Sequence, residues 1–239
     1  MEHTSPSFES QRSSIERIIA AAKAVITDPA GFFRTMPRTG GYVEPATFIV
    51  ATSIATSIVG SLLWLVGSFE SSAHAMSFLV WAFVISPIVS VVGAFVWGGI
   101  FFAIWRALGS EEPYETAFRC GAYMTAITPI VVVLNYFSVI GTLIALGWGF
   151  GLSVIASSEV HGIPRPKARI AFGILFAVFA LLSISSQRAA ERAHEQTEAL
   201  NEKFEKLDEM TPEEAGKAVG EFMKGLQGTV EEKQEAPAE

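Results

Sequence analysis

The sequence predicts an all-α protein: a polytopic membrane helix bundle with five transmembrane helices, an N-terminal interfacial amphipathic helix and a C-terminal amphipathic helical hairpin. Composition is the first observation, since half of the 239 residues are hydrophobic and only 17% are charged, against about 25% in soluble domains. Run length is the second. Residues 120–158 hold no Asp, Glu, Lys, Arg or His over 39 positions, nearly twice the length of about 20 that one bilayer crossing requires. We therefore expect an integral membrane protein.

Residues 1–40 are predicted to form a cytoplasmic N-terminus with an interfacial helix. From Ser14 onward, apolar residues recur at three- and four-residue spacing, which predicts a helix too short and too charged to cross a membrane. Asp28 and Pro29 end that helix, and the following segment mixes Phe, Met and Arg in a way that suits the headgroup layer. A helix packed on a soluble partner is the alternative, which the hydrophobic span that soon follows disfavours.

Residues 41–188 are predicted to form a five-span membrane domain. Four runs lack Asp, Glu, Lys and Arg and are long enough to cross a bilayer: 45–69, 71–105, 120–158 and 170–187. The third run accommodates two crossings, and its Asn, Tyr and Ser residues near 135–138 predict the turn between them. Pro87 predicts a tilt or kink in the second span. The expected spans lie at about 45–67, 76–105, 118–135, 139–158 and 169–187.

The basic residues predict the orientation, because short loops that carry Lys and Arg are retained in the cytoplasm. With the N-terminus inside, the predicted cytoplasmic segments hold ten basic residues, and the outside loops 67–75 and 135–138 hold none. Five spans then place the C-terminus outside. Arg188 and Arg192 follow the fifth span and oppose this arrangement, so a chain with four spans remains open as an alternative.

Residues 189–228 are predicted to form a helical tail, followed by a disordered acidic end at 229–239. The last 52 residues carry the whole net charge of −7. The first tail helix shows a short coiled-coil spacing, and a helix-start pattern at Thr211, Pro212 and Glu214 begins the second. We interpret the pair as a hairpin or docking surface whose candidate partner contacts include Leu200, Phe204 and Phe222.

Small residues at four-residue spacing predict close helix packing. Thr52, Thr56 and Gly60 form such a row in the first span, and Gly147 and Gly151 form another in the fourth. We expect these rows to pack helices within one chain or between copies in a homo-oligomer. The glycine-rich run around them has no preceding strand and no phosphate-binding Lys, so it does not predict a nucleotide site.

The sequence predicts no catalytic, cofactor or metal site. All ionisable residues near the spans lie at predicted span ends, where their side chains can reach the interface. The four histidines are scattered and are expected at the surface, and the single cysteine, Cys120, is expected to be a buried helix thiol. No basic face for nucleic acid is present. The expected partners are the lipid bilayer and a protein, or a second copy of the chain.

A polar conduit is the alternative to a purely packed bundle. Thr125, Thr128 and Asn135, with the hydroxyl row of the first span, could line it, and Pro87 and Pro129 could interrupt the helices as in transporters. A small-solute or ion channel or transporter would follow. Against it, the spans show no inverted repeat, and hydroxyls in membrane helices are usually satisfied locally.

Three segments resemble Yip/Yif-type (Ypt/Rab-interacting) membrane proteins: YETAFRCGAYMTAITP at 114–129, DPAGFFRTMPRTGGYVEPATF at 28–48 and HGIPRPKAR at 161–169. The resemblance implies five membrane helices with a cytosolic N-terminus and the C-terminus across the membrane. The DLYGP and GY-x-T signatures of the eukaryotic members are missing, so the chain looks like the prokaryotic branch and Rab binding is not carried over. This implies a prokaryotic inner membrane.

Together these features predict a non-enzymatic integral membrane protein that organises or scaffolds membrane partners. Its cytoplasmic loops and its tail would make the contacts. In the loop before the third span, Tyr114 and Arg119 are the candidate partner-contact residues.

Overall fold

A computed structural model describes residues 7–67, 75–136 and 138–208 of the chain, and within these residues all regular structure is helical. The predicted all-α class is therefore confirmed. The chain divides into two compact units, Met1–Ser183 and Ile184–Glu239. The first unit contains the helix bundle and is described here, and the described part of the second unit is helical through Asp208.

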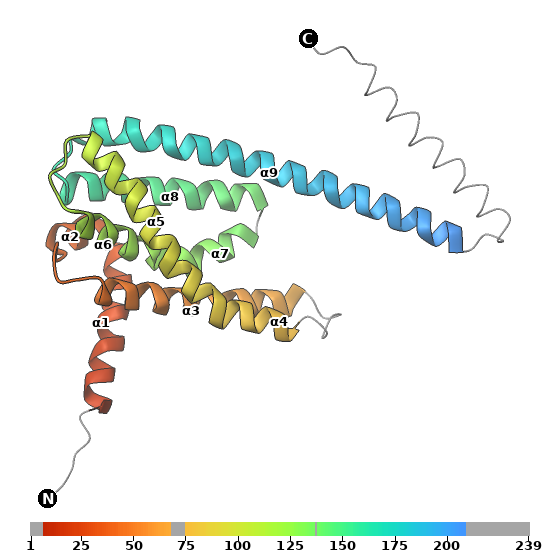
Figure 1. Ribbon diagram of the computed structural model, residues 1–239, viewed down its shortest axis with the longest axis horizontal. Helices are drawn as coiled ribbons and strands as arrows, with labels where there is room; N and C mark the ends of the chain where they lie inside the picture. Colours follow the sequence, from red (N-terminus) through yellow and green to blue (C-terminus); the bar gives the residue numbers. More distant parts are fainter. Residues whose placement is uncertain (1–6, 68–74, 137, 209–239) are drawn as a thin grey trace, which may run out of the picture. The chain divides into compact units, whose positions relative to one another are not determined.

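Five helices are long and apolar enough to cross a membrane, which agrees with the five spans that the sequence predicts. Their apolar stretches are Val43–Leu65, Met76–Ala107, Tyr114–Tyr136, Val139–Glu159 and Arg165–Glu198. Two of these spans are interrupted. The elements that build them are α3 (Val43–Gly67), α4 (Ala75–Val80) with η2 (Trp81–Ile85) and α5 (Ser86–Ala107), α6 (Tyr114–Met124) with η3 (Thr125–Ile127) and α7 (Thr128–Tyr136), α8 (Ser138–Glu159) and α9 (Arg165–Asp208) (Figure 1).

Two shorter segments precede the first span. They are α1 (Ser7–Thr27) and α2 (Pro29–Thr35), separated by Asp28, whose side chain accepts a hydrogen bond from the backbone N–H of Gly31 at 3.0 Å. The predicted helix end at Asp28 and Pro29 is therefore observed as a cap between two helices. Val25 and Phe33 belong to the buried core, so this segment packs on the bundle of its own chain.

The interruptions in the second and third spans occur where proline removes a backbone donor. A π-helical turn, η2, precedes Pro87, and the Ser57 hydroxyl from α3 donates to the backbone oxygen of Ala82 within it. A 3₁₀ turn, η3, precedes Pro129, and the Thr128 hydroxyl donates to the backbone oxygen of Thr125 at 2.8 Å. Hydroxyl groups thus satisfy carbonyls that the proline sites leave open.

The turn between α7 and α8 lies where the sequence predicts it. Helix α7 ends at Tyr136 and α8 begins at Ser138. A Cβ atom at Gly141 would lie only 1.6 Å from the backbone oxygen of Leu134, so this hairpin has no room for a side chain there. Glycine is required by the close approach of the two helices.

The buried core lies toward the end of the bundle opposite that turn. Helix α3 packs against α5 and α7, α6 packs against α5, and α7 packs against α8. The largest buried side chains include Trp105, Phe33 and Phe172, and Cys120 is buried among them as expected. Large apolar side chains elsewhere on the helices are exposed, among them Ile58 on α3 at 49%. Exposed apolar flanks are what a helix bundle in lipid presents to the acyl chains.

Candidate functional site

Three connections between helices meet at one end of the bundle. They are residues 36–42 between α2 and α3, residues 108–113 between α5 and α6, and residues 160–164 between α8 and α9. Figure 1 shows them at the end opposite the α7–α8 turn. We call these three connections the loop cap. Polar side chains join each connection to another.

Arg119 on α6 holds the first connection. Its Nε donates to the backbone oxygen of Pro37 at 2.7 Å, its Nη1 donates to the backbone oxygen of Gly41 at 2.9 Å, and its Nη2 lies 2.8 Å from Oε2 of Glu44. The Arg119 residue is 0% exposed. The expectation that Arg119 contacts a partner is therefore corrected, because its side chain is buried and its guanidinium makes three hydrogen bonds inside the chain. Its planar fork of donors suits this role, since a lysine offers one compact ammonium.

Further bonds join the first connection to the second. The guanidinium of Arg38 pairs with the carboxylate of Glu112, and the Thr116 hydroxyl donates to the backbone oxygen of Arg38 at 3.1 Å. The N–H of Gly41 donates to Oε1 of Glu115 at 2.6 Å. Gly41 has a φ of +81°, in the region that favours glycine. The first connection is therefore fixed along most of its length.

His161 joins the second connection to the third. Its Nδ1 lies 2.7 Å from the hydroxyl oxygen of Ser110, and its ring stacks on Trp105 with ring centres 3.9 Å apart. The indole N–H of Trp105 in turn donates to Ser157 at 2.8 Å. His161 is only 9% exposed, and its Nε2 is buried with no hydrogen-bond partner. The expectation of a surface histidine is therefore wrong here, because the loop folds this ring onto α5.

The environment of His161 favours its neutral form. Burial of the ring, and to a lesser extent the nearby Arg38 cation, lower the pKa of His161 from 6.5 to about 4. The histidine is therefore uncharged at neutral pH. Its role in the cap is to pack and to share a hydrogen bond with Ser110.

Ion pairs also tie α2 and α9 to the cap. Glu159 at the end of α8 lies 2.9 Å from Arg34 and 3.2 Å from Arg165. The ammonium of Lys167 donates to the backbone oxygen of Leu108 at 2.7 Å. These links complete a network in which every connection of the cap is bonded to at least one other.

The outer surface of the loop cap is rich in cations. The exposed basic residues on it and on the adjoining helix ends are Arg34, Arg38, Arg106, Arg165, Lys167 and Arg169. A cavity of about 340 Å³ lies between the three connections and is lined by Arg38, Glu111, Glu112, Glu159 and His161 together with backbone. Among the described residues, no three His, Cys, Asp or Glu side chains are grouped so as to hold a metal ion. This chemistry suits recognition of a charged surface.

Tyr114 also contributes to the interior of the bundle. Its hydroxyl donates to the backbone oxygen of Phe95 on α5 at 2.7 Å, and its ring packs near Tyr42 and Phe102. This bond joins α6 to α5, while Tyr114 is only half-buried, so its expected contact with a partner stays a prediction. The two helices also approach closely at Gly98 on α5, where a Cβ atom would lie 3.3 Å from the Cα of Phe118 on α6.

The row of small residues in the first span faces the third span. The hydroxyl oxygens of Thr52 and Thr125 are 2.8 Å apart, as are those of Thr56 and Thr128. A Cβ atom at Gly60 would lie 3.9 Å from Val132. The threonine hydroxyls that could have lined a conduit thus bond to one another where α3 packs against η3 and α7.

The glycine pair in the fourth span, Gly147 and Gly151, does not make the close helix contact within the chain that its spacing predicts. A Cβ atom at Gly147 or Gly151 would meet nothing within 4 Å. The close contact falls at Gly149 between them, where a Cβ atom would lie 3.4 Å from the Phe176 ring of α9. The sequence identified the glycine-rich segment, and the rotation of α8 determines which glycine faces its neighbour.

The predicted tail contacts belong to the second unit. Leu200 on α9 is exposed at 44%. Phe204 lies within the α9 helix, and Phe222 lies outside the described residues, as does the predicted second tail helix.

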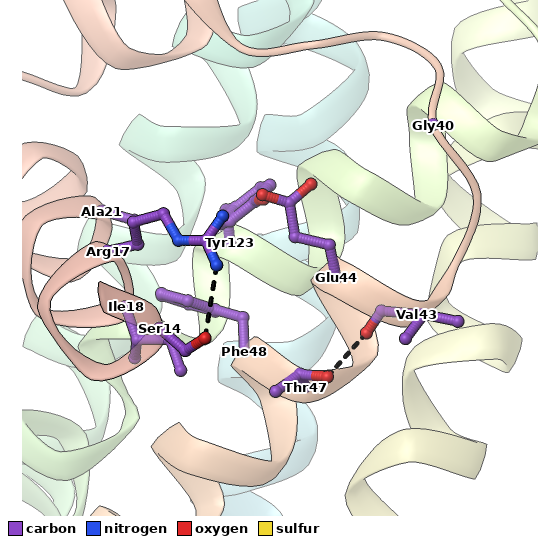
Figure 2. A pocket seen from close by; sticks show the side chains of 10 residues that line it. All are labelled: Ser14, Arg17, Ile18, Ala21, Gly40, Val43, Glu44, Thr47, Phe48 and Tyr123. Carbon is purple, nitrogen blue, oxygen red and sulfur yellow. Dashed lines mark hydrogen bonds between the residues drawn. The ribbon is translucent and has the colours of Figure 1, made fainter. Parts of the chain in front are cut away.

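A second cavity, of about 370 Å³, lies between α1 and the first turns of α3. Figure 2 shows the ten residues that line it, with the Arg17 guanidinium and the Glu44 carboxylate turned toward the same space. Glu44 therefore belongs both to this cavity and to the bond network of Arg119.

Comparison with known proteins gives one match. A family model described as Yip1 domain matches residues 23–186, which is more than half of the chain and includes the whole loop cap and all five apolar helices in full or in large part. No curated protein and no solved structure matches the chain.

Proposed function

The chain belongs to the Yip1 domain family, and from this premise we propose that it is a non-enzymatic scaffold that organises protein partners at the membrane through its loop cap. It is an integral membrane protein with five apolar helices. The family membership agrees with the resemblance found in the sequence.

The observation that carries the proposal is that three connections far apart in sequence are bonded into one surface. Arg119 fixes residues 36–42, Ser110 meets His161, and Lys167 meets Leu108. A surface that is ordered before binding loses little conformational freedom when a partner arrives. A connection that only joined two spans would not require this many bonds. The cap therefore has the properties of a prepared binding surface.

The exposed charges indicate the kind of partner. The exposed basic side chains outside the ion pairs described above, Arg106, Lys167 and Arg169, favour a protein surface with acidic groups. Electrostatic complementarity mainly raises the association rate and the specificity. The same residues support a cytoplasmic position of the cap, since Lys and Arg are retained on that side. We place the N-terminus in the cytoplasm and the C-terminus outside, in a prokaryotic inner membrane.

The tail and the helix flanks supply secondary contacts in this proposal. Leu200, Phe204 and Phe222 would engage a partner or a second copy of the chain, and Gly147 and Gly151 would pack against another copy. The exposure of Leu200 and the open space beside both glycines support these assignments. The row formed by Thr52, Thr56 and Gly60 would pack α3 against the third span of the same chain.

Site-specific photocrosslinking in native membranes tests the proposal. A photoreactive residue at Glu111 or Pro164, both exposed on the cap, should give one protein adduct of defined mass. The matched control is Ile58, which is exposed on the apolar flank of α3 and should crosslink to lipid. Recovery of monomer alone from both cap positions would contradict the proposal.

A further inference from the structure

The cavity between α1 and α3 has an apolar wall and a charged rim. Ile18 and Ala21 of α1 and Phe48 of α3 form part of the wall, and Arg17 and Glu44 supply one cation and one anion. Figure 2 shows both charged groups reaching over this space, with Thr47 on the α3 side. Its volume, about 370 Å³, falls in the range of roughly 300–1,000 Å³ that is usual for small-ligand sites.

The position of the cavity in the fold places it at the level of the lipid headgroups. Its α3 residues, from Val43 to Phe48, are the first turns of a helix whose apolar stretch begins at Val43. The first turns of a transmembrane helix lie where the hydrocarbon layer meets the headgroups. Helix α1 forms the other wall and exposes Ile15 and Ile19, at 55% and 61%, as an interfacial helix does. A lipid can therefore reach this cavity from the side.

We propose that the cavity binds the headgroup of a phosphatidylethanolamine. Its phosphate would accept charge-assisted hydrogen bonds from Arg17, and its primary ammonium would donate to Glu44. An acyl chain would continue along the apolar wall. The pairing follows from the two charged side chains of the rim: Arg17, which also donates to the Ser14 hydroxyl, supplies a cation for the phosphate, and the acceptor positions of Glu44 that Arg119 leaves open receive the ammonium.

A bond to Arg119 positions the Glu44 carboxylate and leaves it able to bind an ammonium group. Its Oε2 bonds to the buried Arg119, while the Glu44 side chain remains 64% exposed. An ionised carboxylate has about four acceptor positions, so the bond to Arg119 leaves capacity for an ammonium. Phosphatidylcholine carries no N–H donor on its headgroup, and phosphatidylglycerol offers only neutral hydroxyl groups, so neither can make the charge-assisted hydrogen bond from an ammonium to Glu44.

Lipid retention by the purified full-length chain tests the proposal. The protein is placed in phosphatidylcholine nanodiscs that contain equal small fractions of phosphatidylethanolamine and phosphatidylglycerol, and bound lipid is counted by native mass spectrometry. We expect phosphatidylethanolamine to be retained about tenfold over phosphatidylglycerol, and Arg17→Gln to reduce its retention about tenfold. Lys23→Gln is the matched control, since Lys23 is exposed on the same helix outside the cavity.

A steric variant separates occupation of the cavity from surface charge. Ala21→Trp should fill the cavity and abolish retention of phosphatidylethanolamine, whereas Ala20→Trp, on the exposed side of α1, should not. Equal retention of phosphatidylethanolamine and phosphatidylglycerol by the unmodified chain would overturn the proposal. The same conclusion would follow if Arg17→Gln and Ala21→Trp both behaved as their controls.

Discussion

The guanidinium of Arg119 is 0% exposed, yet it bonds over 2.8 Å to the carboxylate of Glu44, whose side chain is 64% exposed. The pair joins α6 to the first turn of α3. Burial of a charge is costly unless its donors are satisfied, and the backbone oxygens of Pro37 and Gly41 satisfy two more of them. One residue thus fixes a helix start and the connection that leads into it.

Replacement of Arg119 should destabilise the protein strongly. Arg119→Met leaves the backbone oxygens of Pro37 and Gly41 without their donor, and we expect the free energy of unfolding to fall by about 1–3 kcal/mol. Arg119→Lys should recover little, because one ammonium cannot reach three acceptors in the same fork. Denaturant titration in detergent micelles measures both changes.

Arg34→Met is the control for that experiment. Arg34 also forms an ion pair, with Glu159, but its side chain is 65% exposed. An exposed ion pair contributes below about 1 kcal/mol, so this variant should unfold close to the unmodified chain. Equal losses for Arg34→Met and Arg119→Met would show that burial of Arg119 has no particular importance.

Gly141→Ala should disrupt the hairpin between α7 and α8. The added methyl group would overlap the backbone oxygen of Leu134, and we expect a loss of about 1–3 kcal/mol as the helices separate. Gly93→Ala on α5 is the control, since a Cβ atom there meets nothing within 4 Å, and it should be neutral or slightly stabilising. Thermal unfolding followed by circular dichroism compares the two variants. Identical midpoints would contradict the close approach at Gly141.

Stability should fall as the pH is lowered through the range set by His161. The folded chain holds the pKa of His161 at about 4, below the value of about 6.5 expected when unfolded. Between these values the unfolded chain binds the extra proton, so stability declines from about pH 6.5 toward pH 4, by at most about 3 kcal/mol. His161→Phe, which cannot titrate, should remove this part of the decline in a pH series of unfolding midpoints. His194→Phe serves as the control, and an unchanged slope in His161→Phe would contradict the account.

The membrane plan could be predicted from the sequence because lipid imposes a strict requirement on composition. A charge-free run of 39 residues has few structural solutions, and the turn between Tyr136 and Ser138 falls inside it as expected. Pro87 and Pro129 likewise coincide with interrupted helices, since proline removes the same donor in any setting. Both predictions depend only on composition and on neighbouring residues, and a single sequence contains all of that information.

The loop cap could not be predicted in the same way, because its bonds join residues far apart in the chain. Arg119 meets Pro37 and Gly41 about eighty positions earlier, and His161 meets Ser110 about fifty positions earlier. A single sequence does not contain these pairings, so both side chains were placed at the surface. The glycine contact at Gly149 was missed for a similar reason, since Phe176 on another helix determines which face of α8 is inside.

The proposed orientation predicts a definite pattern of chemical labelling. In a Cys120→Ala background, a membrane-impermeant thiol reagent applied outside should label cysteines at Ser72 and Ala236. A cysteine at Glu111, which is exposed on the cap, should react only after permeabilisation. Protection of the Ala236 position in intact cells would favour four spans and a cytoplasmic tail.

Whether the loop cap is the binding surface is tested by exchanging the charges of one cap ion pair and measuring the crosslink yield from the photoreactive residue at Pro164. Arg38→Glu alone places its new carboxylate beside that of Glu112, which should weaken the link between two connections of the cap and reduce the yield about tenfold. The double variant Arg38→Glu with Glu112→Arg restores an ion pair at the same position and should recover much of the yield. If the single variant crosslinked to the same partner as efficiently as the unmodified chain, the loop cap would not be the binding surface.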